Sequence, residues 1–202
     1  MTFQIGKITF EMSFPLVALM TAVIIFDTSM SVILCFASVI LHETGHLLAL
    51  KYYGSFPDRM KLTLFDIAII DRKKNARSDK AELVITLAGV TVNFMIAGLF
   101  FFLFRFFQEK TLETFYITNL TLALFNSLPV DSLDGGQALL ILLGKILSPY
   151  HAVKVLDIIS FIILIPTAVL GFLVLLQSKY NFTLLLTAMY LMTLILLKNK
   201  KN

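Results

Sequence analysis

The chain has 202 residues, of which 58% are hydrophobic and only 15% charged, and its formal net charge is +4. Soluble domains carry about 25% charged and about 45–50% apolar residues. The composition therefore excludes a soluble enzyme and predicts an all-α polytopic membrane protein, whose backbone groups are satisfied within helices. We expect residues 1–202 to form a single membrane-embedded domain.

Apolar segments predict about six transmembrane helices, each of which needs about 20 residues. In chain order they cover residues 14–26, 31–50, 83–104, 115–143, 155–176 and 182–197. The fourth segment is too long for one straight helix. Pro129 and the pair Gly135 and Gly136 interrupt it, and we expect the helix to break there, because proline removes an amide donor and glycine loosens the backbone.

One sizeable loop, residues 59–80, joins the second and third segments. Within it, residues 61–70 alternate imperfectly and are rich in β-branched and aromatic types. This pattern predicts one or two short strands at the cytoplasmic surface, with residues 71–75 as an exposed turn. The alternative is an interfacial loop whose charges lie among lipid headgroups.

The basic residues predict the orientation in the cell membrane. If the N-terminus is cytoplasmic, only Arg105, Lys110 and Lys179 of the 17 basic residues fall on the outer side. Cytoplasmic loops carry the excess of lysine and arginine, so both termini should face the cytoplasm. The same bias accounts for the net charge, and we expect the bilayer, and no nucleic acid, as its partner.

The second segment contains the pattern His42-Glu43-Thr44-Gly45-His46. Residues four apart share one helix face, so His42 and His46 can bind one metal ion, and Glu43 can act as base toward a water that the metal activates. Ionisable residues within a span are costly and indicate function. The alternative is a polar cluster that packs helices together.

A catalytic zinc ion usually has three protein ligands, so a third is needed from elsewhere. His151 follows Pro149 in an expected cytoplasmic turn and fits an interfacial residue better. The interrupted stretch of the fourth segment is more suitable, because broken backbone at membrane depth lines protein cavities. It offers two carboxylates, Asp131 and Asp134.

The motifs at residues 42–46, 126–129 (Asn-Ser-Leu-Pro) and 133–136 (Leu-Asp-Gly-Gly) together resemble the site-2 protease family of intramembrane zinc metalloproteases. The resemblance covers about residues 30–145, the three-span catalytic core of the family. The sporulation branch, which acts on a membrane-associated pro-sigma factor, is the most similar. Family members of this size are mostly bacterial or archaeal, and we expect a bacterial source.

The resemblance implies roles for individual residues. One Zn²⁺ per chain would be held by His42, His46 and Asp134, with Asp131 as the rival third ligand. Glu43 would be the general base, and Asn126 would hold the substrate or the developing oxyanion.

A further family pattern matches in part at residues 88–93. Gly89 and Asn93 agree with it, whereas Val90 replaces the usual proline, which puts a local helix distortion in doubt. Gly89 is also explained by close helix packing. Asn93 is either an amide that bridges helices or a support for a metal ligand.

These features predict a zinc metalloendopeptidase that hydrolyses membrane-spanning or membrane-associated protein substrates. An extended substrate could pair with the strand-like segment at residues 62–70. The alternatives are a non-proteolytic zinc-binding scaffold and a metal transporter. A transporter needs polar residues along several spans, and the last two segments are nearly devoid of them. An inactive scaffold would not need Glu43. Neither the substrate nor the oligomeric state can be predicted.

Overall fold

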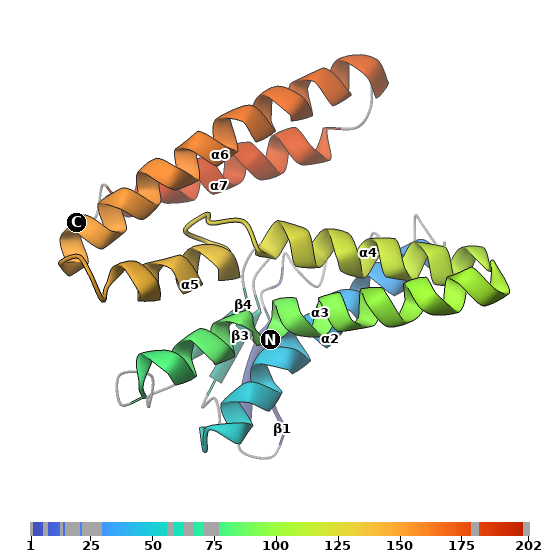
Figure 1. Ribbon diagram of the computed structural model, residues 1–202, viewed down its shortest axis with the longest axis horizontal. Coiled ribbons are helices and arrows are strands. Elements are labelled where there is room, and N and C mark those ends of the chain that lie inside the picture. Colours follow the sequence, from blue (N-terminus) through green and yellow to red (C-terminus); the bar gives the residue numbers. More distant parts are fainter. Residues whose placement is uncertain are drawn as a thin grey trace. The chain divides into compact units, whose positions relative to one another are not determined.

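The computed structural model describes residues 2–5, 8–12, 14, 21, 30–55, 59–62, 67–70, 77–178 and 182–199. These residues form six helices and one four-stranded sheet (Figure 1). The chain divides into two compact units, Met1–Leu124 and Phe125–Asn202. The helical fold class is confirmed. The first predicted span, at residues 14–26, and the predicted turn at residues 71–75 lie outside the described residues, apart from residues 14 and 21.

The first unit is built on two long apolar helices, α2 (Met30–Tyr52) and α3 (Asp79–Phe107), which pack against each other. Both are long and apolar enough to cross a membrane, so the second and third predicted spans are confirmed. Helix α3 begins after Ser78, whose hydroxyl accepts a hydrogen bond from the amide of Ala81. Such a cap satisfies one of the amide donors that every helix start leaves open.

Helix α4 (Lys110–Asn126) follows directly after α3. The turn between them is made at Gln108, the one described non-glycine residue with a left-handed backbone, at φ 51°. The Gln108 amide bonds back to the carbonyl of Phe104 and closes the last turn of α3, as left-handed helix ends commonly do. Across this turn the rings of Phe100 on α3 and Phe115 on α4 meet edge to face with centroids 4.6 Å apart, and Phe115 is buried.

The first unit also contains the sheet, with strands β1 (Thr2–Ile5), β2 (Ile8–Met12), β3 (Arg59–Leu62) and β4 (Ile67–Ile70) in the order β1-β2-β3-β4. The outer pairs are antiparallel and the central pair β2–β3 is parallel. The prediction of strands within residues 61–70 is confirmed. The N-terminal hairpin was missed, although β-branched and aromatic residues flank Gly6 and Lys7 in the manner of a hairpin.

The second unit contains α5 (Asp134–Leu143), α6 (Pro149–Ser178) and α7 (Thr183–Asn199). Helices α6 and α7 lie side by side (Figure 1). Helix α6 is long enough to cross a membrane, which confirms the fifth predicted span. The sixth predicted span is helix α7, which is apolar but shorter than a full membrane span.

The fourth predicted span is broken, as expected. Helix α4 ends at Asn126 and α5 begins at Asp134. The two glycines at the start of α5 are required sterically: a Cβ on Gly135 would collide with the carbonyl of Ser127, and one on Gly136 with the carbonyl of Val130. The segment at residues 127–133 therefore folds tightly back over the first turn of α5.

An apolar cluster holds this segment within the second unit. Its buried members come from the segment itself, from α6 and from α7: Val130, Leu133, Leu164, Leu191 and Ile195. Val130 and Ile195 are fully buried, and burying one such side chain contributes about 1.5–3 kcal/mol. The segment that leads to Asp134 is thus part of a packed core.

Candidate metal centre

The two histidines of the second predicted span lie on one face of α2, buried against α3. His42 is 5% exposed and His46 is 8% exposed. Their rings meet edge to face with centroids 4.9 Å apart, and the two Nε2 atoms are 3.2 Å apart. The helical spacing of four residues therefore brings two ring nitrogens together in a protected site, as the sequence predicted.

The opposite nitrogen of each ring is held by an acceptor. His42 Nδ1 is 2.8 Å from Oδ1 of Asn93, and His46 Nδ1 is 2.8 Å from the carbonyl oxygen of Ile85. A carbonyl oxygen only accepts, so His46 carries its proton on Nδ1. The amide nitrogen of Asn93 donates to two other acceptors, on Ser38 and Asn119, so its oxygen faces His42, which also carries its proton on Nδ1.

Both Nε2 atoms then present lone pairs to each other across 3.2 Å. Two neutral imidazoles in this tautomer cannot form a hydrogen bond between these atoms, and a cation bound by both would remove the repulsion between the lone pairs. A tetrahedral zinc ion with bonds of about 2.05 Å places two nitrogen ligands about 3.3 Å apart. The pair therefore fits zinc in donor type, tautomer and spacing.

Gly89 on α3 makes room for this site. A Cβ at this position would collide with His46 Nε2 and would lie 2.8 Å from both Cε1 and Nε2 of His42. One helical turn of α2 is also close to this point, since a Cβ on Gly45 would lie 3.0 Å from the Cα of Gly89. Glycine at residue 89 thus leaves space for both histidine rings, in addition to the helix packing that the sequence also allowed.

Asn93 both bridges helices and supports a metal ligand, so the two interpretations left open from the sequence hold together. It is fully buried and hydrogen-bonds to α2 and α4 as well as to His42. Val90, which replaces the family's proline, is buried within α3, and α3 continues through it from Asp79 to Phe107. The substitution therefore leaves the support of His42 intact.

The other predicted site residues occupy distinct positions. Glu43 follows His42 on α2 and is half-buried. Asn126 is the last residue of α4, and it is half-buried. Asp134 is the first residue of α5, where the helix dipole favours a carboxylate. His151 is exposed in the first turn of α6, 2.8 Å from the Ser148 hydroxyl.

The rival carboxylate, Asp131, is engaged elsewhere within the second unit. Its Oδ1 lies 2.7 Å from Nζ of Lys198 on α7. Its amide donates to the hydroxyl of Ser160 on α6 over 3.0 Å, and Gln137 donates to its carbonyl. A buried carboxylate paired with a lysine has its charge compensated. Asp131 thus ties residues 127–133 to α6 and α7.

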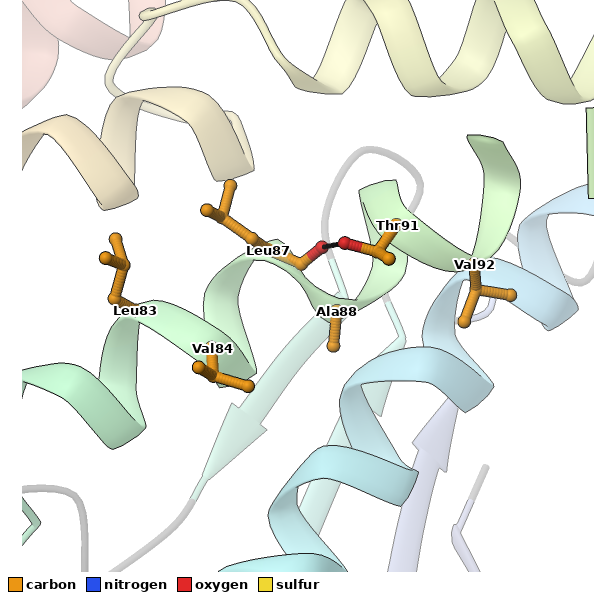
Figure 2. Close-up of a pocket in the computed structure, with 6 residues that line it drawn as sticks. All are labelled: Leu83, Val84, Leu87, Ala88, Thr91 and Val92. Atoms are coloured by element: carbon orange, nitrogen blue, oxygen red, sulfur yellow. Dashed lines mark hydrogen bonds between the residues drawn. The ribbon is translucent and has the colours of Figure 1, made fainter. Parts of the chain in front are cut away.

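An apolar pocket of about 440 Å³ lies along one face of α3 (Figure 2). It is lined by Leu83, Val84, Leu87, Ala88, Thr91 and Val92. The Thr91 hydroxyl donates to the carbonyl of Leu87 on the same helix, so the hydrogen of its one polar lining side chain is already used. The pocket suits hydrocarbon and has no metal-binding side chain.

Known proteins resemble the chain in sequence and in fold. No protein-family model matches the chain. A zinc metalloprotease of Methanocaldococcus jannaschii is 34% identical over 119 residues, which cover 56% of this chain and 34% of that protein. The chain thus matches about a third of the length of this curated relative. The solved structure of a site-2 protease from Methanocaldococcus jannaschii matches with a TM-score of 0.66 and 25% identity, covering 96% of this chain and 92% of that one.

The fold and the paired histidines define a multi-pass membrane protein with a buried metal centre. The chain is similar in sequence to the zinc metalloprotease and in fold to the site-2 protease of Methanocaldococcus jannaschii.

Proposed function

We propose that the chain is an intramembrane zinc metalloprotease that hydrolyses peptide bonds of membrane-spanning or membrane-associated proteins. The observation that carries the proposal is the pair of buried Nε2 atoms at 3.2 Å, each on a ring whose Nδ1 is held by an acceptor. The relatives support the chemistry, since one is a zinc metalloprotease and the other a site-2 protease.

In this proposal, His42, His46 and Asp134 hold one zinc ion per chain. Three protein ligands leave a fourth position open for chemistry, and a His₂-carboxylate set is typical of zinc proteases. Asp134 is preferred to Asp131 because the latter is paired with Lys198. Residues 1–202 would act together as one protease domain.

Zinc bound there supplies Lewis acidity, which activates a water molecule and polarises the peptide carbonyl. Glu43 takes the proton from the attacking water and returns it to the leaving amine. The amide of Asn126 donates a hydrogen bond to the carbonyl oxygen as negative charge develops there. Asn93 and the Ile85 carbonyl keep both histidines in the tautomer that leaves Nε2 available.

The substrate must present an extended backbone, because carbonyls within a helix are already hydrogen-bonded. Strand β4 is an end strand of the sheet and pairs, among the described residues, with β3 alone. Its other edge can add an extended substrate strand. We propose a cytoplasmic position for both termini and the sheet, from the distribution of basic residues. A pro-sigma factor, as in the sporulation branch, is one substrate to examine.

The proposal is tested by co-expressing the chain with single-span membrane proteins and following their cleavage. Glu43→Gln should retain zinc and lose cleavage, because only the base is removed. Thr44→Val is the matched control, since Thr44 is exposed and, within the part of the chain that the structure describes, its hydroxyl bonds only to the Ile40 carbonyl of its own helix. Undiminished cleavage by Glu43→Gln would refute the proposal, and zinc flux across vesicles without cleavage would favour transport.

A further inference from the structure

A buried polar cluster connects three helices of the first unit behind the metal centre. Its members are Ser38 on α2, Asn93 on α3 and Asn119 on α4, and each is 0% exposed. Burying such groups in an apolar helix bundle is unfavourable unless every donor and acceptor is paired. The pairing within this cluster is complete enough to fix the direction of each hydrogen bond.

The orientation of the Asn119 amide follows from two neighbours. Its Nδ2 lies 2.9 Å from the carbonyl oxygen of Phe115, which only accepts. The same Nδ2 lies 2.9 Å from the Ser38 hydroxyl, whose own hydrogen is used on the carbonyl of Leu34 at 2.8 Å. Nitrogen therefore donates to both, and the Oδ1 of Asn119 is left as an acceptor.

Asn119 and the Ser38 carbonyl together set the orientation of Asn93, and Asn119 makes the shorter bond. The Nδ2 of Asn93 donates to Oδ1 of Asn119 over 2.9 Å and to the carbonyl of Ser38 over 3.3 Å. Its Oδ1 is thereby directed at His42 Nδ1, 2.8 Å away. A chain of hydrogen bonds with one direction runs from the ring of His42 to the backbone of α4.

We propose that Asn119 is a positioning residue that fixes His42 in the Nδ1-protonated tautomer by fixing the amide of Asn93. This inference rests on the proposed role of His42 as a zinc ligand. Without Asn119, only the longer bond of 3.3 Å to the Ser38 carbonyl opposes reversal of the Asn93 amide, and a reversed amide donates to His42 Nδ1. The proton of His42 would then lie on Nε2 and could bond to His46 Nε2 at 3.2 Å. That hydrogen bond would occupy the Nε2 atoms of both histidines and so compete with zinc binding.

The test compares zinc affinity among variants of the purified full chain, measured by chelator competition. Asn119→Leu should weaken zinc binding by about 10–100-fold, the range for loss of groups that orient metal ligands. Thr118→Val is the matched control, because among the described residues its hydroxyl bonds only to the Thr114 carbonyl on the same helix. It should bind zinc as the wild type does. Asn119→Asp keeps an acceptor for Asn93 but places an oxygen beside the Phe115 carbonyl, so its zinc affinity should lie between those of Asn119→Leu and the wild type.

Two further readouts separate positioning from general stability. The visible spectrum of the cobalt-substituted protein should change in Asn119→Leu and not in Thr118→Val. Since Asn119 acts through Asn93, the double variant with Asn93→Ala should bind zinc no more weakly than Asn93→Ala alone. Additive losses, or equal losses in Thr118→Val, would overturn the inference.

The outcomes also separate this inference from the proposed function. If His42→Ala binds zinc as tightly as the wild type, the proposed metal site is wrong. If His42→Ala loses zinc while Asn119→Leu retains full affinity, only the role of Asn119 is wrong. Should Asn119→Leu fail to fold, Ser38→Ala decides. It removes the acceptor of one Asn119 bond and should weaken zinc binding several-fold, and full zinc affinity in Ser38→Ala would overturn the inference.

Discussion

Gly89→Ala should damage the metal centre with the addition of a single methyl group. The new Cβ would collide with His46 Nε2 and lie 2.8 Å from His42 Nε2, so at least one ring must move from its ligand position. Overpacking of this kind typically costs about 1–3 kcal/mol. If that cost falls on the zinc-bound state, zinc affinity drops by about 5–150-fold, because 1.4 kcal/mol is a factor of ten.

The matched control is Gly98→Ala on the same helix. A Cβ at Gly98 would meet no atom within 4 Å, and replacing a helical glycine with alanine usually stabilises a helix by about 0.5–1 kcal/mol. Chelator competition on both variants, with thermal unfolding of the zinc-free proteins, separates the effects. Equal zinc affinity in Gly89→Ala and Gly98→Ala would refute the steric reasoning.

Two further substitutions test the support of the segment before Asp134. Lys198→Met should lower the free energy of unfolding by about 1–3 kcal/mol, because it leaves the buried carboxylate of Asp131 without its cation. Lys198→Arg keeps the cation and should not lower it. Equal denaturation midpoints for the two variants would contradict the role of the ion pair. Gly136→Ala should destabilise the protein by a similar amount, because its Cβ would collide with the carbonyl of Val130. Gly144→Ala is the control in the same denaturation assay, since its Cβ would lie 3.3 Å from the nearest atom.

The helical part of the fold could be predicted because each membrane span is encoded by one long apolar run of neighbouring residues. The break in the fourth span was also local, since Pro129 and the glycine pair cannot continue a helix. The strands at residues 59–62 and 67–70 gave a weaker signal. Strands β1 and β2 were missed. The parallel pairing of β2 with β3 brings Phe10 beside Met60, about fifty positions away in the sequence.

The metal centre was predictable where the helical period alone decides geometry, as for His42 and His46. Among its supports, Asn93 was offered as one of two alternatives, and the others were not predicted because they depend on which faces of three helices meet. Asn119 belongs to no motif and is linked to Ser38 across 81 positions. Gly89 had two explanations in sequence, and only the proximity of both rings distinguishes them.

The proposed zinc site is tested most directly by X-ray absorption spectroscopy at the zinc edge, with metal analysis, on purified protein. We expect one zinc per chain, bound by two imidazole nitrogens and a carboxylate oxygen at about 2.0–2.2 Å. Zinc should be lost in Asp134→Asn and kept in Asp131→Asn. A spectrum with fewer than two imidazoles, or zinc lost from Asp131→Asn but not from Asp134→Asn, would contradict the proposed site.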